Sequence, residues 1–208
     1  MHARRFDAMT RLLAVPAHRR AILRGALVGG ILGRLAAPGS VSAVPQVAGV
    51  CDVDGDGVID TFDNPRFAES FTAAVSGKLS EIQIRIDKTA GTTGDFVVQL
   101  RAADPVSGEP TKVLASKRVA NGSVDEGEKV IVRARFRRRK TIKLVQDKRY
   151  AVVISRPHGS GDHAGFAARF AVDNPCDGDS FFFSEQQSGP FTPGDANTDM
   201  PFAVLVGF

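Results

Sequence analysis

Apolar and polar residues alternate with a period of two along most of the chain after residue 66, and this pattern constrains the fold more than any other feature. In residues 79–87, Ile82, Ile84 and Ile86 fall on one face, while polar and charged side chains fall on the other. This alternation is typical of β-strands that bury a single face. An amphipathic helix would need a period of 3.6, which no segment after residue 43 sustains.

The same alternation recurs in a series of short segments separated by turn-forming clusters of glycine, proline, asparagine and serine. These segments are 95–102, 112–120, 129–137, 141–145, 149–155, 164–172, 180–184 and 201–208. Roughly eight to ten short strands at this spacing predict an all-β, antiparallel two-sheet sandwich. The 14 phenylalanines and the single tyrosine, Tyr150, would supply its core.

The first 43 residues differ in composition from the rest of the chain. Arg19 and Arg20 precede a small apolar run at 25–33, and Val41-Ser42-Ala43 follows with the small-x-small pattern that a signal peptidase reads. This order resembles a cleavable twin-arginine export signal ending at Ala43. The alternative is a short buried helix. The uncharged stretch between Arg24 and Arg34 has nine residues, whereas a membrane span needs about 20, so no transmembrane anchor is expected.

The charge of the chain separates at the same point. The whole chain has 27 basic and 23 acidic residues, a net charge of +4. Seven of the bases and one of the acids lie before residue 44, which leaves 20 bases and 22 acids, a net charge of −2. The basicity therefore belongs to the leader, and we expect no nucleic-acid partner. We therefore predict that the protein is exported and is then secreted, periplasmic or held at the cell surface.

Cys51 and Cys176 are the two cysteines, and both follow the leader. An even cysteine count in an exported protein favours a disulfide. The alternative is two buried thiols. A bridge would join the start of the working domain to a late acidic turn, and Asp177 or Asp179 of that turn would then approach the residues that follow Cys51.

A cluster of aspartates directly after Cys51 has the spacing of a calcium-binding loop. Counting Asp52 as position 1, carboxylates occupy positions 1, 3, 5, 9 and 12, and Gly57 occupies position 6. The expected ligands are the side chains of Asp52, Asp54, Asp56, Asp60 and Asp63 and the carbonyl of Val58. With the Asn64-Pro65 that follows, the loop resembles a thrombospondin type 3 repeat and one half of a dockerin. We expect a structural calcium ion here; a solvated acidic turn is the alternative.

A basic stripe occupies one strand of the predicted sandwich. Alternation in residues 129–137 puts Arg133 and Arg135 on the outer face together with Arg137, and Arg138 and Arg139 continue beyond the strand. The stripe is a candidate site for an anionic polymer. The alternative is a solvated strand face that protects a sheet edge.

Several loose motifs indicate a family resemblance over residues 66–208. They are Phe67-Ala68-Glu69-Ser70-Phe71, Thr93-Gly94-Asp95-Phe96, Pro110-Thr111-Lys112-Val113-Leu114-Ala115-Ser116 and Arg149-Tyr150-Ala151-Val152-Val153. Together they resemble the jelly-roll sandwich modules of secreted and surface-anchored bacterial proteins, which are mostly ancillary. The resulting organisation is a signal peptide at 1–43, a linker with the aspartate loop at 44–65, and the sandwich at 66–208.

No nucleophile elbow, zinc-binding helix or phosphate loop is present, so we expect no catalytic activity. The predicted function is a non-catalytic binding or adhesion module at the cell surface, stabilised by calcium, with carbohydrate or another surface component as its partner. A purely structural envelope or matrix protein is the second interpretation, and a secreted hydrolase is the third. The absence of tryptophan weakens the expectation of sugar stacking.

Overall fold

The computed structural model describes residues 44–52, 57–60, 66–88, 94–136, 142–155, 166–172, 176, 180–184, 186, 189–194 and 198–207. The predicted export signal, with Arg19 and Arg20, lies outside these residues. Residues 44–208 form one compact unit. Among the described segments, no helix has the length and apolar character needed to cross a bilayer.

The described residues form fourteen strands and a single short 3₁₀ turn at Asn121–Ser123. The strands are β1 (Gln46–Cys51), β2 (Gly57–Asp60), β3 (Arg66–Thr72), β4 (Gly77–Lys88), β5 (Phe96–Ala103), β6 (Pro110–Val119), β7 (Gly127–Arg135), β8 (Lys143–Leu144), β9 (Arg149–Ser155), β10 (Phe166–Val172), β11 (Ser180–Ser184), β12 (Thr192–Pro193), β13 (Thr198–Asp199) and β14 (Phe202–Gly207).

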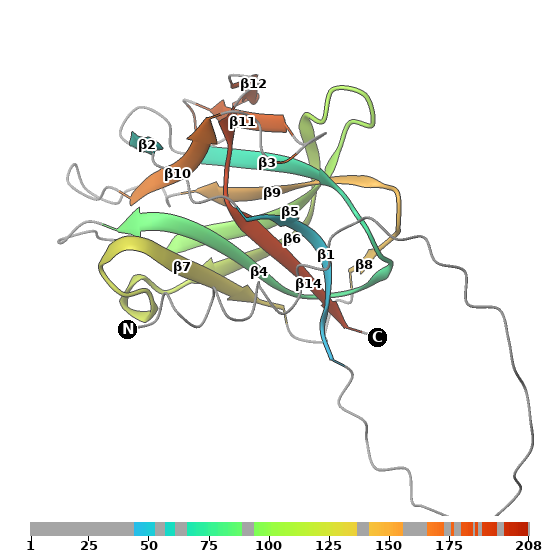
Figure 1. The fold of residues 1–208 in the computed structure, drawn as a ribbon, viewed down its shortest axis with the longest axis horizontal. Helices are drawn as coiled ribbons and strands as arrows, with labels where there is room; N and C mark the ends of the chain where they lie inside the picture. The colour runs from blue at the N-terminus through green and yellow to red at the C-terminus, as the bar shows by residue number, and fades with distance from the viewer. Residues whose placement is uncertain are drawn as a thin grey trace, which may run out of the picture. The chain divides into compact units, whose positions relative to one another are not determined.

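Two antiparallel sheets make up the sandwich. The eight-stranded sheet follows the order β1-β14-β4-β10-β13, with β2 paired to β10 and with β7 and β8 paired to β4. The six-stranded sheet follows the order β12-β11-β3-β9-β5-β6. In Figure 1, β7, β4 and β14 can be followed as neighbours in the first sheet, and β11, β3 and β9 as neighbours in the second. The all-β, two-sheet antiparallel prediction is therefore confirmed.

The core lies between the two sheets and is built by the predicted alternation. Ile82, Ile84 and Ile86 of β4 are fully buried, as are the inward residues of β5. Phe71 packs against Phe202 of the opposite sheet, with 5.3 Å between ring centroids. Each such side chain contributes about 1.5–3 kcal/mol when it is removed from water, which makes this shared core the main source of stability.

The segment expected to be a linker, 44–65, contributes two strands to the eight-stranded sheet. Strand β1 pairs with β14, and Ala48 and Cys51 of β1 are buried in the core. The register of this pairing shifts between Val47 and Gly49. This irregularity breaks the period-two pattern, which explains why alternation did not reveal the strand.

Strand β3 is buried on both faces. Phe67 and Phe71 face the main core, whereas Ala68 packs on the other side with Val153, Phe182 and Phe191 in a smaller cluster. Phe191 comes directly before β12, and its side chain covers part of the outer face of the six-stranded sheet. An outer layer of this kind was not expected from the sequence.

Candidate functional site

A groove of about 810 Å³ opens where the β5–β6 hairpin meets the turn between β8 and β9. Residues from β3, β5, β6, β8 and β9 and from the two turns line it. The lining residues are Thr72, Ala102, Ala103, Pro105, Leu114, Ile142, Lys143, Val145, Asp147, Lys148, Arg149 and Tyr150.

The lining of this groove combines apolar and charged groups. Leu114, Ile142 and Tyr150 supply apolar surface, whereas three cations, Lys143, Lys148 and Arg149, accompany the single carboxylate Asp147. A mixed apolar and polar lining of this kind is common in ligand sites. The excess of positive charge favours a ligand that is rich in oxygen atoms or anionic.

Backbone hydrogen bonds fix the turn between β8 and β9. Ala73 accepts from the N–H of Asp147 at 2.9 Å and donates to the carbonyl of Lys148 at 2.9 Å. The hydroxyl of Ser76 also accepts from the N–H of Gln146 at 2.8 Å. Asp147 has a φ of 62°, which is tolerated best by glycine, asparagine and aspartate. This wall of the groove is therefore held in one conformation by the segment that follows β3.

Asp104 organises the β5–β6 turn on the opposite side. Its Oδ1 accepts from the N–H groups of Ser107 at 2.8 Å and Val106 at 2.9 Å. These two hydrogen bonds lower the pKa of the Asp104 carboxyl below its usual 3.8, and the bond from Ser107 has the larger effect. Arg149 donates to the carbonyl of Val106 at 3.1 Å, so one groove-lining side chain connects both walls.

Tyr150 cannot act as an open stacking platform in the groove. Its side chain is 6% exposed, its ring lies 5.9 Å from that of Phe71, and its hydroxyl accepts from the N–H of Val145 at 2.9 Å. Among the residues whose side chains the structure describes, the exposed large hydrophobic residues are all valines: Val44, Val50, Val106, Val113 and Val145.

The disulfide predicted between Cys51 and Cys176 is formed. The N–H of Cys176 donates to Oδ2 of the buried Asp199 at 3.0 Å, which fixes the late turn from a second side. Although these two sulfurs and a carboxylate oxygen of Asp199 lie within 4.8 Å of one another, sulfurs joined in a disulfide offer no thiolate to a metal. Asp177 and Asp179 lie outside the described residues.

The aspartate loop is described only in part. Asp52 follows β1, and its Oδ1 lies 3.3 Å from Nη2 of Arg85 in an ion pair. Val58 and Asp60 belong to β2, whose backbone pairs with β10 through the partners Arg169 and Ala167. The side chain of Asp60, like the whole of Asp54, Asp56 and Asp63, lies outside the description. The calcium site therefore stays a prediction.

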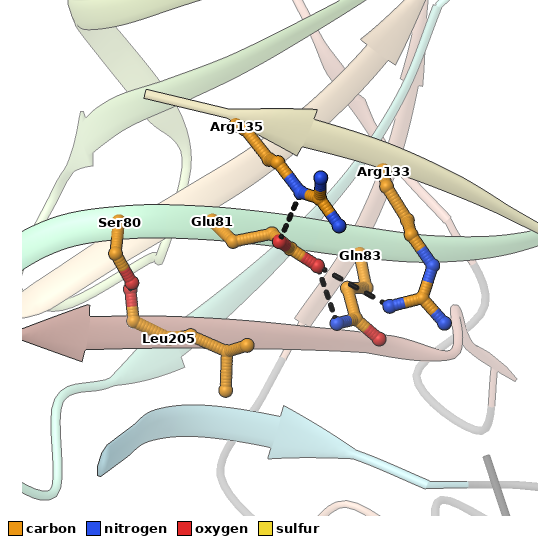
Figure 2. Close-up of polar contacts among 6 residues, drawn as sticks. All are labelled: Ser80, Glu81, Gln83, Arg133, Arg135 and Leu205. Carbon is orange, nitrogen blue, oxygen red and sulfur yellow. Dashed lines mark hydrogen bonds and ion pairs between the residues drawn. The ribbon is translucent and has the colours of Figure 1, made fainter. Parts of the chain in front are cut away.

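The basic stripe on β7 is paired with a carboxylate. Figure 2 shows Glu81 of β4 between Arg133, whose Nη1 lies 3.3 Å from Oε1, and Arg135, whose Nε lies 3.0 Å from Oε2. Gln83 adds a hydrogen bond to the same carboxylate at 2.6 Å. The outward orientation agrees with the alternation, but Glu81 partly neutralises both arginines. Arg137, Arg138 and Arg139 lie outside the described residues.

Two sets of polar residues were missed by sequence reasoning. Glu69 is fully buried on the inner face of β3, a position that its spacing from Phe67 and Phe71 could have revealed. Arg66 and Arg101 both contact the ring of Phe191 on the outer face of the six-stranded sheet. No local pattern could have predicted this cluster, because Phe191 is ninety residues from Arg101 in the sequence.

The protein is a two-sheet β-sandwich with an open groove. Three of the four charged residues that line this groove are basic. No known protein-family model matches the sequence, and no curated protein matches it. Among solved structures, the chain is similar to the cysteine protease and lectin-like domains of Cwp84, a surface layer associated protein of Clostridium difficile. The identity is 13% and the TM-score is 0.44; the match covers 69% of this chain and 33% of that chain. The chain thus spans about a third of that protein's length.

Proposed function

We propose that the protein is an exported, non-catalytic binding module of the jelly-roll type, and that it holds an oxygen-rich ligand in the groove between the β5–β6 hairpin and the β8–β9 turn. Carbohydrate is the first candidate. The observation that carries this proposal is the groove itself, with its apolar surface, its basic side chains and the fixed turns on both sides. Rigid turns lower the ordering cost of binding.

The same lining supports a non-catalytic role. Among the residues that line the described groove, Asp147 is the only carboxylate, and none is a histidine or cysteine. Glycoside hydrolysis commonly uses two carboxyl groups about 5–10 Å apart, and general acid–base catalysis uses histidine most often. The buried carboxylate of Glu69 bonds the backbone of Met200, which is a structural arrangement.

The disulfide supports export. A bridge between Cys51 and Cys176 would be maintained in an oxidising compartment, outside the cytosol. Export through a twin-arginine signal containing Arg19 and Arg20 is part of the proposal and rests on the sequence. A protein secreted, periplasmic or held at the surface would meet extracellular polysaccharide.

Calcium is the proposed structural cofactor of the aspartate loop. The disulfide next to Asp52 would fix one end of the loop, and β2 would fix its second half. Asp52 fits this role because its carboxylate is 39% exposed, although the ion would compete with Arg85 for it. When bound, calcium would offset the repulsion among the five carboxylates and so stabilise this part of the domain.

A glycan array with the full chain tests the ligand, and two variants test the site. Val145→Trp puts a bulky ring into the groove, and we expect it to abolish binding of any glycan that the natural chain retains. Val106→Trp is the matched control, because Val106 is 87% exposed and outside the lining. Equal binding by both variants would overturn the groove assignment.

A purely structural envelope or matrix component is the second candidate. The observation that favours it is the burial of Tyr150, together with the absence of an exposed aromatic side chain among the residues whose side chains the structure describes. Many sugar sites stack the ring of the sugar on such a side chain. No retained glycan across the array would support this second function over the first.

A further inference from the structure

Two arginines contact the ring of one phenylalanine on the outer face of the six-stranded sheet. The guanidinium carbon of Arg66, from β3, lies 4.5 Å from the centre of the Phe191 ring. That of Arg101, from β5, lies 5.3 Å from the same centre. Phe191 is 6% exposed and packs on Ala68 and Val153, so the ring is a fixed support for both cations.

Arg66 is used to hold the segment that carries Phe191. Its Nε donates to the carbonyl of Gln186 at 2.8 Å, and its Nη2 donates to Ser184 Oγ at 2.7 Å and also to the carbonyl of Gly189. The residue is 4% exposed. Arg66 therefore positions the cluster and contributes charge, but it has little surface for a ligand.

Arg101 has donors that its neighbours do not use. Its Nε donates to Gln99 Oε1 at 2.9 Å, and its Nη1 makes a long contact of 3.4 Å with the carbonyl of Thr111. Within the described part of the chain, Nη2 of Arg101 and the amide nitrogen of Gln99 have no acceptor, and both residues are half-exposed. Gln99 and Arg101 therefore present N–H donors that no oxygen atom of the described residues accepts.

The charge of this cluster is also unbalanced. No carboxylate among the described residues forms an ion pair with Arg66 or Arg101. The pKa of Arg66 is lowered mainly by burial of its guanidinium group and further by the neighbouring charge of Arg101. Holding two cations close together in a partly dry environment is unfavourable unless an anion joins them.

We propose that Arg101 and Gln99 bind an oxyanion, a carboxylate or sulfate group of an acidic polysaccharide, on the outer face of the six-stranded sheet. Phe191 would hold the guanidinium plane, and Arg66 would add a second positive charge. This inference names the class of polysaccharide and so rests on the proposed function, but its site differs from the groove. Neither Gln99 nor Arg101 is among the residues that line the groove.

Planar oxyanions fit this arrangement better than a neutral sugar does. A guanidinium edge matches two oxygen atoms of a carboxylate or sulfate, and charge-assisted hydrogen bonds of this kind are stronger than neutral ones. A site for single-stranded nucleic acid would need an exposed aromatic face on which bases stack. Phe191 is buried and already covered by the two arginines, so it cannot provide that face.

The test measures the Kd of the full chain for three polymers: polygalacturonate, dextran sulfate and uncharged dextran. We expect the natural chain to bind at least one acidic polymer and Arg101→Gln to raise that Kd about tenfold or more, the effect of losing one charge-assisted bond. The acidic polymer that responds to Arg101→Gln identifies the oxyanion. Arg101→Lys keeps the charge without the planar edge and should give an intermediate Kd.

Arg118→Gln is the matched control. Arg118 belongs to the same sheet, its side chain is 67% exposed, and it pairs with Asp95 at 3.4 Å. Its loss removes the same charge from another place, so the Kd should change by less than about twofold, because a single exposed charge contributes little. Equal losses in Arg118→Gln and Arg101→Gln would mean diffuse attraction and would overturn the site, as would failure of both acidic polymers to bind.

Failure of this inference can be told apart from failure of the groove. If Val145→Trp abolishes binding of an acidic polymer and Arg101→Gln leaves it unchanged, the groove stands and the oxyanion site is refuted. The reverse pattern refutes the groove and supports the arginine cluster. The thermal midpoint of each variant, expected to lie within a few degrees of the natural chain, separates a lost contact from a lost fold.

Discussion

The backbone N–H of Met200 donates to Oε2 of Glu69 at 2.8 Å, across 131 residues of sequence. Glu69 belongs to the six-stranded sheet, and Met200 lies between β13 and β14 of the eight-stranded sheet. Both residues are fully buried. A charged or polar group is costly in such a place unless it is hydrogen-bonded, so this contact joins the two sheets through a polar connection inside the core.

Replacement of Glu69 should reveal the value of this connection. Glu69→Leu leaves the N–H of Met200 buried without its acceptor, and we expect a loss of about 1–3 kcal/mol in the free energy of unfolding. Glu69→Gln retains an acceptor oxygen and should lose less. Urea denaturation measures both variants, and the exposed Glu109→Gln serves as the control. A Leu variant as stable as the Gln variant would contradict the proposed role of the contact.

Removal of the disulfide should destabilise the domain. Changing Cys51 and Cys176 together to serine opens a loop that spans 125 residues, and a native bridge of this kind contributes about 2–5 kcal/mol. Guanidinium denaturation of the double variant measures the loss. The natural chain should shift by the same amount when a reductant is added, whereas the double variant should not respond. A reductant-insensitive midpoint in the natural chain would refute this prediction.

Local pattern and chain topology account for different parts of the molecule. The isoleucines of β4 could be assigned to the core from the sequence, because alternation alone decides which face of a regular strand is buried. Strand β1 could not, because the irregularity at Gly49 interrupts its alternation. The pairing of the two cysteines could be predicted from their count, whereas the hydrogen bond from Cys176 to Asp199 could not, because it depends on how the late turn folds.

The candidate sites divide in the same way. The aspartate loop is contiguous, so its spacing could be read directly from residues 52–63. The groove brings together segments from Thr72 to Tyr150, and the arginine cluster joins Arg66, Arg101 and Phe191. These sites depend on sheet order and on the segment that covers the outer face. A single sequence gives no signal for either.

Calcium should raise the thermal midpoint of the full chain if the aspartate loop binds it. A ligand whose free concentration is about a hundred times its Kd stabilises the folded state by about 2.7 kcal/mol. A chelator should reverse the rise in thermal midpoint. Asp56→Asn should reduce the response, since Asp56 is an expected ligand. Asp125→Asn, which changes an exposed acid outside the loop, should respond like the natural chain. Midpoints that are identical with calcium and with chelator would refute the site.

Acid should loosen the β5–β6 turn through Asp104. The N–H groups of Ser107 and Val106 lower the pKa of the folded carboxyl below 3.8. This contribution to stability is fully present above pH 3.8 and is lost as the pH falls through the lower folded pKa, because protonation favours the unfolded chain. An NMR titration of the Asp104 carboxyl, read with the amide signals of Val106 and Ser107, measures this transition. Asp104→Asn should abolish the coupled change in these amides, and its persistence would contradict the assignment.

Gly49 provides a test of strand β1, which sequence patterns did not reveal. A Cβ at this position would lie 2.2 Å from Cδ2 of the buried Phe71 ring, so the ring or the strand would have to move. Gly49→Ala should therefore lower the free energy of unfolding by about 1–3 kcal/mol, the usual cost of overpacking a core. Gly122→Ala is the matched control, because a Cβ at Gly122 meets nothing within 4 Å. Urea denaturation compares the two variants. Equal stability would mean that β1 does not pack against Phe71, and the sandwich would then begin after the aspartate loop.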